Sequence, residues 1–319
     1  MEIVRGYSAL PRRLRSPVVA IGNFDGVHRG HAHIFRHAQE LARDLATDAE
    51  AVVLTFEPHP AKVLAPSFAP PLITSLDRKL ELIAGEGIDV TVVQPFDRAF
   101  AALSPEQFID DVLVNGLGAR CVCVGYDFTF GQKRSGTIAL LEALGRARGF
   151  AVNVASAFTV DDMVCSSTKV REFVLEGRVD GAAILLGRDP EVEGEVVRGD
   201  GRGRTIGVPT ANLRAETELL PKNGVYAGWG EVIGSGKRHA AAINVGTNPT
   251  FVSGMAVTVE AHLLDANEDL YGKRLRLGFG KRLRAEERFA SVDALITQIR
   301  KDVDETRMIW EQRSPNHAG

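Results

Sequence analysis

The chain lacks several features that mark particular classes of protein. It has three cysteines, and two of them, Cys121 and Cys123, lie two residues apart in an apolar run, where their thiols share one face of a strand. Buried free thiols are therefore expected rather than a disulfide framework. No uninterrupted apolar run reaches the roughly 18 residues that a membrane span needs, and residues 1–5 lack the apolar core of a signal peptide. We expect a cytoplasmic protein with no membrane partner.

A strong excess of one charge is also missing. The formal net charge is −3, so the composition offers no basic patch and nucleic acid is not an expected partner. The hydrophobic fraction of 45% and the charged fraction of 25% are those of an ordinary globular protein. A length of 319 residues is enough for about two domains. These values leave the oligomeric state open.

The most informative stretch is 22–31, which reads Gly-Asn-Phe-Asp-Gly-Val-His-Arg-Gly-His. It lies between a short apolar run and a long helical pattern, so a strand, a glycine-rich turn and a helix N-terminus are expected in that order. Such a junction points backbone N–H groups at one place and suits phosphate. His28 and His31 would lie on one side of the first helical turn, where they could donate to phosphoryl oxygens. The alternative is a surface turn with two solvated histidines.

From residue 18 to about 186, apolar strands alternate with helical patterns. Near-continuous apolar strands in this arrangement predict a parallel sheet covered on both faces, with ligands bound at the carboxyl ends of the strands. The predicted strands are 18–21, 51–56, 89–93, 120–125 and 151–155. The predicted helices are 31–47, 76–84, 105–113, 138–148 and 168–175.

Three further motifs fall at the expected ligand-binding edge. His59 follows the second strand and could contact phosphate or flavin, although its two neighbouring prolines could simply stiffen a loop. Asp127 lies in a glycine- and aromatic-rich turn that could hold a flat ring system or could be a buried aromatic turn. The hydroxyl residues of 166–168 open a helix, where such residues usually act as caps. Arg171, about one turn later, adds a cationic fork suited to phosphate.

The pattern changes near residue 187, where short alternating strands separated by Gly, Asn, Asp and Pro begin. This pattern predicts a small antiparallel β-barrel, followed by a helix over 291–310 that packs on it and a disordered tail after residue 313. We therefore predict two domains, 1–186 and 187–319. The predicted barrel strands are 193–197, 224–231, 240–244, 257–264 and 275–279.

The second half contains a second possible chemical centre. The glycine-rich, basic segment 199–207 could fold over a polyphosphate. Thr210 and Asn212, two residues apart on an extended segment, would face the same way and offer the oxygen ligands that Mg²⁺ accepts. Glu260 lies in an alternating strand and could take a proton from an attacking hydroxyl. A mobile hairpin and a solvent-exposed glutamate are the alternatives.

His-x-Gly-His resembles the signature of the nucleotidyltransferase superfamily, and the whole motif at 22–31 resembles that of the bacterial bifunctional riboflavin kinase/FAD synthetase family. Segments 125–131 and 165–171 also match that family, with Cys165 in place of the usual isoleucine. The resemblance implies a Rossmann-like nucleotidyltransferase sheet with FMN near Asp127. The residues that it places around ATP or gives a role in AMP transfer are Gly22, Asn23, Phe24, Asp25, His28, His31, Ser166, Ser167, Thr168 and Arg171.

The second half matches the riboflavin kinase module of the same family over Pro-Thr-Ala-Asn at 209–212, Asn244–Phe251, Glu260–Asp265 and Leu283–Phe289. The resemblance implies that Glu260 is the base for the ribityl 5′-hydroxyl and that Arg284 lies beside the flavin. The resemblance assigns Thr210 and Asn212 to Mg²⁺-ATP, as metal ligands. Gly203, Arg204 and Gly207 of the basic segment are expected to contact the phosphates.

The sequence thus predicts an enzyme that phosphorylates riboflavin to FMN and adenylylates FMN to FAD, with ATP as co-substrate and Mg²⁺ as cofactor. Val208 replaces a phenylalanine that is common in the family, and Asp189-Pro190 replaces a common Arg-Pro. These departures could alter the affinity of the kinase site for nucleotide or flavin, and they leave the proposed chemical groups in place. A different acceptor, such as nicotinamide mononucleotide or phosphopantetheine, is one alternative. A flavin-sensing barrel without catalysis and the loss of one activity are the others.

Overall fold

The structure is a computed structural model that describes residues 1–199, 208–250, 254–266 and 268–313. The chain forms two compact units. The first comprises Met1–Pro71 and Leu76–Ser166, and the second comprises Leu72–Ser75 and Ser167–Gly319. The functional division predicted after residue 186 stays a prediction. The predicted tail after residue 313 lies outside the described residues.

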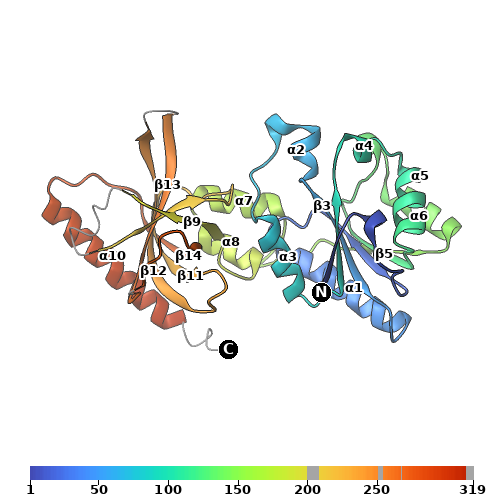
Figure 1. Cartoon of the computed structure of the whole chain (residues 1–319), viewed down its shortest axis with the longest axis horizontal. Helices are drawn as coiled ribbons and strands as arrows, with labels where there is room; N and C mark the ends of the chain where they lie inside the picture. Colours follow the sequence, from blue (N-terminus) through green and yellow to red (C-terminus); the bar gives the residue numbers. More distant parts are fainter. Residues whose placement is uncertain (200–207, 251–253, 267, 314–319) are drawn as a thin grey trace. The chain divides into compact units, whose positions relative to one another are not determined.

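The first unit is built on a six-stranded parallel sheet with the order β1-β4-β3-β2-β5-β6 (Figure 1). The five predicted strands are confirmed within one or two residues. The edge strand β1 was not predicted, because only Val4 of its four residues is buried and the alternation is too short to recognise. The strands are β1 (Glu2–Arg5), β2 (Val18–Ile21), β3 (Ala51–Glu57), β4 (Val90–Pro95), β5 (Cys121–Gly125) and β6 (Ala151–Ala155).

Both faces of this sheet carry a hydrophobic core, as predicted. Val19 and Ile21 of β2 point into one core, and Val18 and Ala20 point into the other. Cys121 and Cys123 lie in the second core as buried free thiols, as the spacing predicted. The helices of this unit are η1 (Tyr7–Ala9), α1 (Arg29–Leu45), α2 (Pro60–Leu64), η2 (Pro66–Phe68), α3 (Leu76–Gly85), α4 (Arg98–Ala101), α5 (Pro105–Gln107), η3 (Phe108–Gly116), η4 (Gln132–Arg134) and α6 (Ile138–Arg148).

The predicted helix over 105–113 is confirmed, with a change of geometry inside it. Ser104 and Gln107 form a capping box at the start of α5, and the helix continues as the π-helical segment η3. A short hairpin of β7 (Thr159–Val160) and β8 (Met163–Val164) ends the unit.

The second unit contains a closed antiparallel barrel with the order β10-β13-β12-β11-β14-β9 (Figure 1). The predicted barrel is confirmed, and β10 is a strand that the prediction missed. Its strands are β9 (Glu191–Val197), β10 (Ala211–Ala215), β11 (Gly224–Val232), β12 (Arg238–Thr250), β13 (Gly254–Leu263) and β14 (Arg274–Arg284). Its helices are α7 (Ser167–Glu176), α8 (Val179–Leu186) and α10 (Val292–Arg313).

The barrel interior is filled by alternate residues of its strands, including Leu213, Ile243 and Val259. Helix α10 packs against β11 and β12, as predicted for the last helix. Asp189, one of the departures from the family pattern, accepts hydrogen bonds from Trp229 Nε1 at 3.0 Å and from Arg313 Nη1 at 3.1 Å. Its carboxylate therefore joins the barrel to the end of α10.

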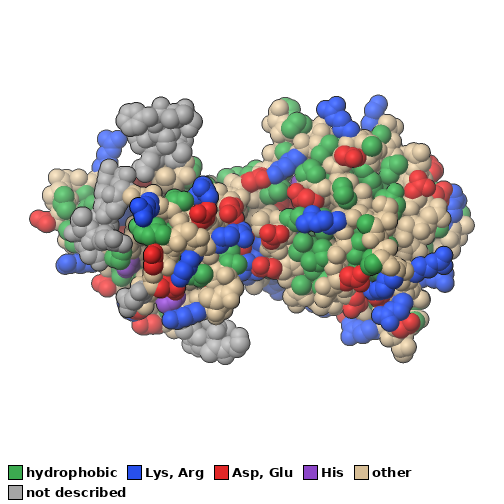
Figure 2. Space-filling view, viewed as in Figure 1, with side chains coloured by type: hydrophobic (Ala, Val, Ile, Leu, Met, Phe, Trp, Pro, Cys, Tyr) green, Lys and Arg blue, Asp and Glu red, His purple; other side chains and the backbone are tan. Residues whose placement is uncertain are grey.

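Figure 2 shows acidic and basic side chains interspersed over the face in view, which agrees with the small net charge. Among the described residues, no helix is both long enough and apolar enough to cross a membrane.

Candidate active sites

The turn between β2 and α1 is held in a conformation that its sequence would not adopt alone. Phe24 and Val27 have positive φ angles of 49° and 39°, which are unusual for residues with a side chain. Both side chains are buried, at 2% and 4% exposure, so packing in the second core compensates for the strain. Gly26, with φ of 83°, uses the same region without penalty. The turn is therefore preformed.

His28 ends this turn and begins helix α1. Its Nδ1 accepts a hydrogen bond from the His31 backbone N–H at 3.3 Å, which makes His28 the N-cap. The helix therefore starts at Arg29, two residues before the predicted start. The rings of His28 and His31 are stacked, with centroids 3.6 Å apart, and His28 is 4% exposed. The two imidazoles thus form one rigid pair at the positive end of the helix.

Asn23 and Asp25 lie in the same turn, with different environments. The Asn23 side chain is exposed, whereas Asp25 is buried at 5% exposure. The Asn23 carbonyl accepts hydrogen bonds from Thr55 Oγ1 at 3.1 Å and from Lys79 Nζ at 3.4 Å. Sequence reasoning assigned no role to Lys79. The available signal was a lysine within the apolar face of α3, one residue before the buried Leu80.

Two other residues that the sequence singled out, Asp127 and His59, follow other strands of the sheet. Asp127 is exposed just after β5, and a Cβ built on Gly125 would lie 3.3 Å from its Oδ1. The aromatic residues of the same turn have a structural role, because Phe128 and Phe130 stack at 5.6 Å within the core. His59 caps α2 by accepting a hydrogen bond from the Ala61 N–H at 3.2 Å.

Cys165 contacts the start of α1, because a Cβ built on Gly30 would lie 3.3 Å from its Cβ. Ser166, the next residue, is the last of the first unit. Ser167, Thr168 and Arg171 lie at the start of α7 in the second unit. A joint role of these residues with the histidine pair stays a prediction.

In the barrel, three polar residues form a row across neighbouring strands. Asn212 of β10 lies directly opposite Glu260 of β13, and Glu260 lies directly opposite Asn244 of β12. Opposite residues of an antiparallel pair project from the same face. The residues on either side of Glu260, Val259 and Ala261, point into the core. The row therefore lies on the outer face of the barrel, and its three side chains are half-buried.

Two further contacts fix the environment of Asn212. The backbone of Gly199 lies so close that a Cβ there would overlap the Asn212 side-chain amide. His262 Nδ1 lies 2.7 Å from the Pro209 carbonyl, which anchors the residue before Thr210 to the same face of β13 as Glu260. Thr210 and Asn212 are thereby held beside Glu260. Asn244 was part of a matched segment but had no assigned role, although period-two alternation in β12 placed it away from the core.

Arg284 makes a structural contact that the sequence did not indicate. Its guanidinium forms a bidentate ion pair with Asp302 of α10, with a shortest N–O distance of 2.8 Å. Asp302 is buried, at 6% exposure, so this pair fastens α10 to the end of β14. The predicted flavin contact of Arg284 stays a prediction. The predicted phosphate-loop residues Gly203, Arg204 and Gly207 lie outside the described residues.

A parallel sheet followed by a closed antiparallel barrel is the architecture of a two-part transferase. A family model described as FAD synthetase matches residues 10–169, and one described as riboflavin kinase matches residues 186–310. The chain belongs to the family of bifunctional riboflavin kinases/FMN adenylyltransferases. It is an enzyme with two activities: it phosphorylates riboflavin to FMN and adenylylates FMN to FAD, with ATP as the co-substrate.

Individual relatives match over nearly the whole chain. The bifunctional riboflavin kinase/FMN adenylyltransferase of Escherichia coli (strain K12) is 40% identical over 304 residues, which cover 95% of this chain and 96% of the relative. That of Bacillus subtilis (strain 168) is 36% identical and covers 96% of each chain. A crystal structure described as a macrolide-efflux protein from Streptococcus pneumoniae has a TM-score of 0.84 at 31% identity, covering 96% of this chain and 99% of that one.

Proposed function

We propose that AMP transfer takes place at the turn between β2 and α1. An oxygen of the FMN phosphate attacks the α-phosphorus of ATP, the bond to the β-phosphate breaks, and pyrophosphate leaves. His28 and His31 donate hydrogen bonds to the phosphoryl oxygens as negative charge grows. The stacked pair at the N-terminus of α1 supports this role. The residues proposed to surround ATP and FMN are Gly22, Asn23, Phe24, Asp25, Asp127, Ser166, Ser167, Thr168 and Arg171.

We propose that phosphoryl transfer to riboflavin takes place on the outer face of the barrel. Glu260 accepts the proton of the ribityl 5′-hydroxyl while the hydroxyl oxygen attacks the γ-phosphorus of ATP. The bond to the β-phosphate breaks, and ADP leaves. The observation that carries this assignment is the direct cross-strand pairing of Asn212 with Glu260, which sets the base beside the proposed ATP-binding residues. Gly203, Arg204 and Gly207 are proposed to contact the phosphates, and Arg284 the flavin.

The proposed metal is Mg²⁺, held by Thr210 and Asn212. A hydroxyl and an amide oxygen are the hard donors that Mg²⁺ prefers, and it usually takes its other ligands from substrate phosphates and water. Over the residues that the structure describes, no group of three or more His, Cys, Asp or Glu side chains could hold a metal ion. Thr210 and Asn212 supply only two such oxygens, so they fit a metal that arrives with ATP, and when bound it would neutralise charge on the phosphates.

One experiment separates the two sites. The purified enzyme is incubated with riboflavin, ATP and Mg²⁺, and FMN is separated from FAD. We expect His28→Ala to stop at FMN. We expect Glu260→Gln to leave riboflavin unchanged but still convert supplied FMN to FAD. Loss of both activities in either folded variant would contradict the assignment of two separate sites.

The same assay tests the role of Glu260. Undiminished FMN formation by Glu260→Gln would contradict its assignment as the base. The cytoplasmic location and the absence of a nucleic-acid partner stay predictions.

A further inference from the structure

Lys79 is a buried lysine beside the proposed AMP-transfer site. It lies in the first turns of α3 and is 6% exposed. Its helix neighbours Leu80 and Ile83 pack into the protein, so Lys79 occupies a position that an apolar residue would fill without penalty. Lysine is rarely buried to this extent unless its ammonium group is paired. The residue therefore calls for a reason beyond packing.

The contacts of Lys79 form a closed triangle at the carboxyl ends of β2 and β3. Its Nζ donates to the Asn23 carbonyl and to Thr55 Oγ1, each at 3.4 Å. Thr55 Oγ1 in turn donates to the Asn23 carbonyl at 3.1 Å. Thr55 is fully buried and Lys79 is nearly so, and the contact between them is buried. The ammonium group thus links α3, β3 and the first residues of the turn.

Burial of the Lys79 ammonium group is energetically unfavourable, because the group loses its hydration. Burial lowers the pKa of Lys79, and the carboxylates of Glu57 and Asp25 only partly oppose that shift. Its two hydrogen bonds go to a carbonyl and a hydroxyl, which repay less of the lost hydration than an ion pair would. A methionine would fit the same space without this penalty.

We propose that Lys79 is a positioning residue for AMP transfer. This proposal rests on the proposed function of the His28–His31 turn. By holding the Asn23 carbonyl, the ammonium group fixes the chain that runs into the strained residues Phe24 and Val27 and ends at His28. Without it, the Asn23 carbonyl keeps only its contact with Thr55, and the start of the turn can shift relative to His28. Because catalytic groups misplaced by about 1 Å can lose roughly 100-fold in rate, the loss would appear in the chemical step.

Three variants and two controls test this proposal. Lys79→Met removes the charge and keeps the shape, Lys79→Arg keeps a cation, and Thr55→Val removes the hydroxyl of the triangle. Ile83→Val changes the packing of the same helix without touching the triangle. His28→Ala reports on the proposed site itself. For each variant, kcat and KM for ATP and for FMN are measured in FAD formation. Calorimetric unfolding of the first unit reports on folding, and riboflavin phosphorylation by the second unit controls for the amount of protein.

We expect Lys79→Met to lower kcat for FAD formation at least about tenfold, with both KM values within about twofold and riboflavin phosphorylation unchanged. Lys79→Arg should recover part of the loss, and Ile83→Val should keep its kcat. Because both side chains act through the same carbonyl, the loss of rate in the Lys79→Met/Thr55→Val double variant should be smaller than the two single losses combined. Thr55→Val and Lys79→Arg carry the test if Lys79→Met does not fold.

The proposal is overturned if Lys79→Met keeps its kcat, if only KM rises, or if the losses in the double variant add. If Thr55→Val and Lys79→Arg are both unaffected, the proposal is likewise wrong. An active His28→Ala variant would instead refute the proposed site. An inactive His28→Ala with an unchanged Lys79→Met would refute only the role of Lys79.

Discussion

Asn212 and Glu260 lie directly opposite each other on β10 and β13, and both project from the outer face of the barrel. Asn244 occupies the matching position on the other side of Glu260. The acid is therefore flanked by two amides from strands on either side. Asn212 lies two residues after Thr210 on the same segment, whereas Asn244 lies on a different strand. Asn244 is therefore a matched control for testing whether Asn212 is a metal ligand.

The first prediction concerns Mg²⁺. Asn212→Ala should raise the Mg²⁺ concentration that gives half-maximal riboflavin phosphorylation by at least about tenfold, because it removes one proposed ligand oxygen. Asn244→Ala should leave that concentration within about twofold. Titration of the initial rate with Mg²⁺ at saturating ATP and riboflavin measures both. Equal shifts in the two variants would contradict the metal role of Asn212.

The second prediction uses the close approach of Gly199 to the Asn212 amide. Gly199→Ala should displace that amide, because a Cβ would occupy its place. We expect riboflavin phosphorylation to fall by about 10-fold to 100-fold, as for other misplaced catalytic-site groups, while FAD formation from FMN is kept. Gly85→Ala is the control, since a Cβ there meets open space. An unchanged kinase rate in Gly199→Ala would show that the Asn212 position is not critical.

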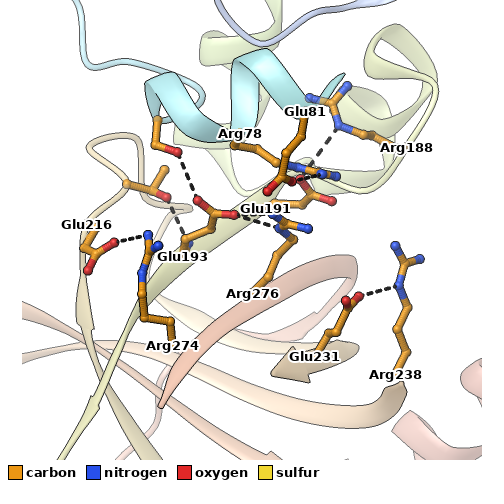
Figure 3. Close-up of polar contacts among 12 residues, drawn as sticks. Arg78, Glu81, Arg188, Glu191, Glu193, Glu216, Glu231, Arg238, Arg274 and Arg276 are labelled. Atoms are coloured by element: carbon orange, nitrogen blue, oxygen red, sulfur yellow. Dashed lines mark hydrogen bonds and ion pairs between the residues drawn. The ribbon is translucent and has the colours of Figure 1, made fainter. Parts of the chain in front are cut away.

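The third prediction concerns the buried ion pair of Glu193 and Arg276. Their side chains are 4% and 8% exposed and 2.7 Å apart, and Ser75 Oγ donates to the same carboxylate at 3.0 Å (Figure 3). Arg276→Met would leave the carboxylate buried without its cation, so we expect a loss of about 3–5 kcal/mol in the free energy of unfolding of the second unit. Urea unfolding followed by tryptophan fluorescence measures it, because both tryptophans lie in that unit.

The exposed pair of Glu216 and Arg274 supplies the matched control (Figure 3). Its side chains are 40% and 44% exposed and 2.6 Å apart, so removal of the charge in Glu216→Gln should cost less than about 1 kcal/mol. Similar losses in both variants would show that burial of Glu193 and Arg276 does not determine their contribution.

The fourth prediction concerns pH and Glu50 in the first unit. Burial alone would raise the pKa of Glu50, but hydrogen bonds from Arg12 and from the Arg15 N–H hold the pKa below its ordinary value of 4.5. A lowered folded-state pKa stabilises the protein above pH 4.5, and this stabilisation is lost as the pH falls through the lowered value. At pH 7, Glu50→Gln should therefore unfold at a lower temperature than the unchanged protein. The gap between the two unfolding temperatures should narrow below pH 4.5.

Differential scanning calorimetry between pH 3 and pH 7 measures this effect. At pH 7, the free energy of unfolding of Glu50→Gln is expected to be about 1.5–3 kcal/mol below that of the unchanged protein, the range for hydrogen bonds to a charged group. Glu2→Gln is the control, because Glu2 contacts the same Arg12 but its side chain is 34% exposed. A difference that does not depend on pH would mean that the Glu50 charge contributes little.

The elements that could be predicted from the sequence were those with a strong local pattern. The apolar runs of β2 to β6 and the capping signals of Ser104 are set by near neighbours in the chain. Strand β10 was missed because only Ala211 and Leu213 of its five residues are buried, which is too short an alternation to recognise. Strand β1 was missed for the same reason.

By itself, the sequence determined the fold class of each half, the turn that carries His28 and His31, and the family. These depend on residue order and local spacing, which the chain displays directly. Only the tertiary structure decided that Asn212, Glu260 and Asn244 form one outward row, and that Lys79 reaches the Asn23 carbonyl. Strand register and the burial of a helix face arise from contacts between distant segments, and no local pattern records which partners will meet.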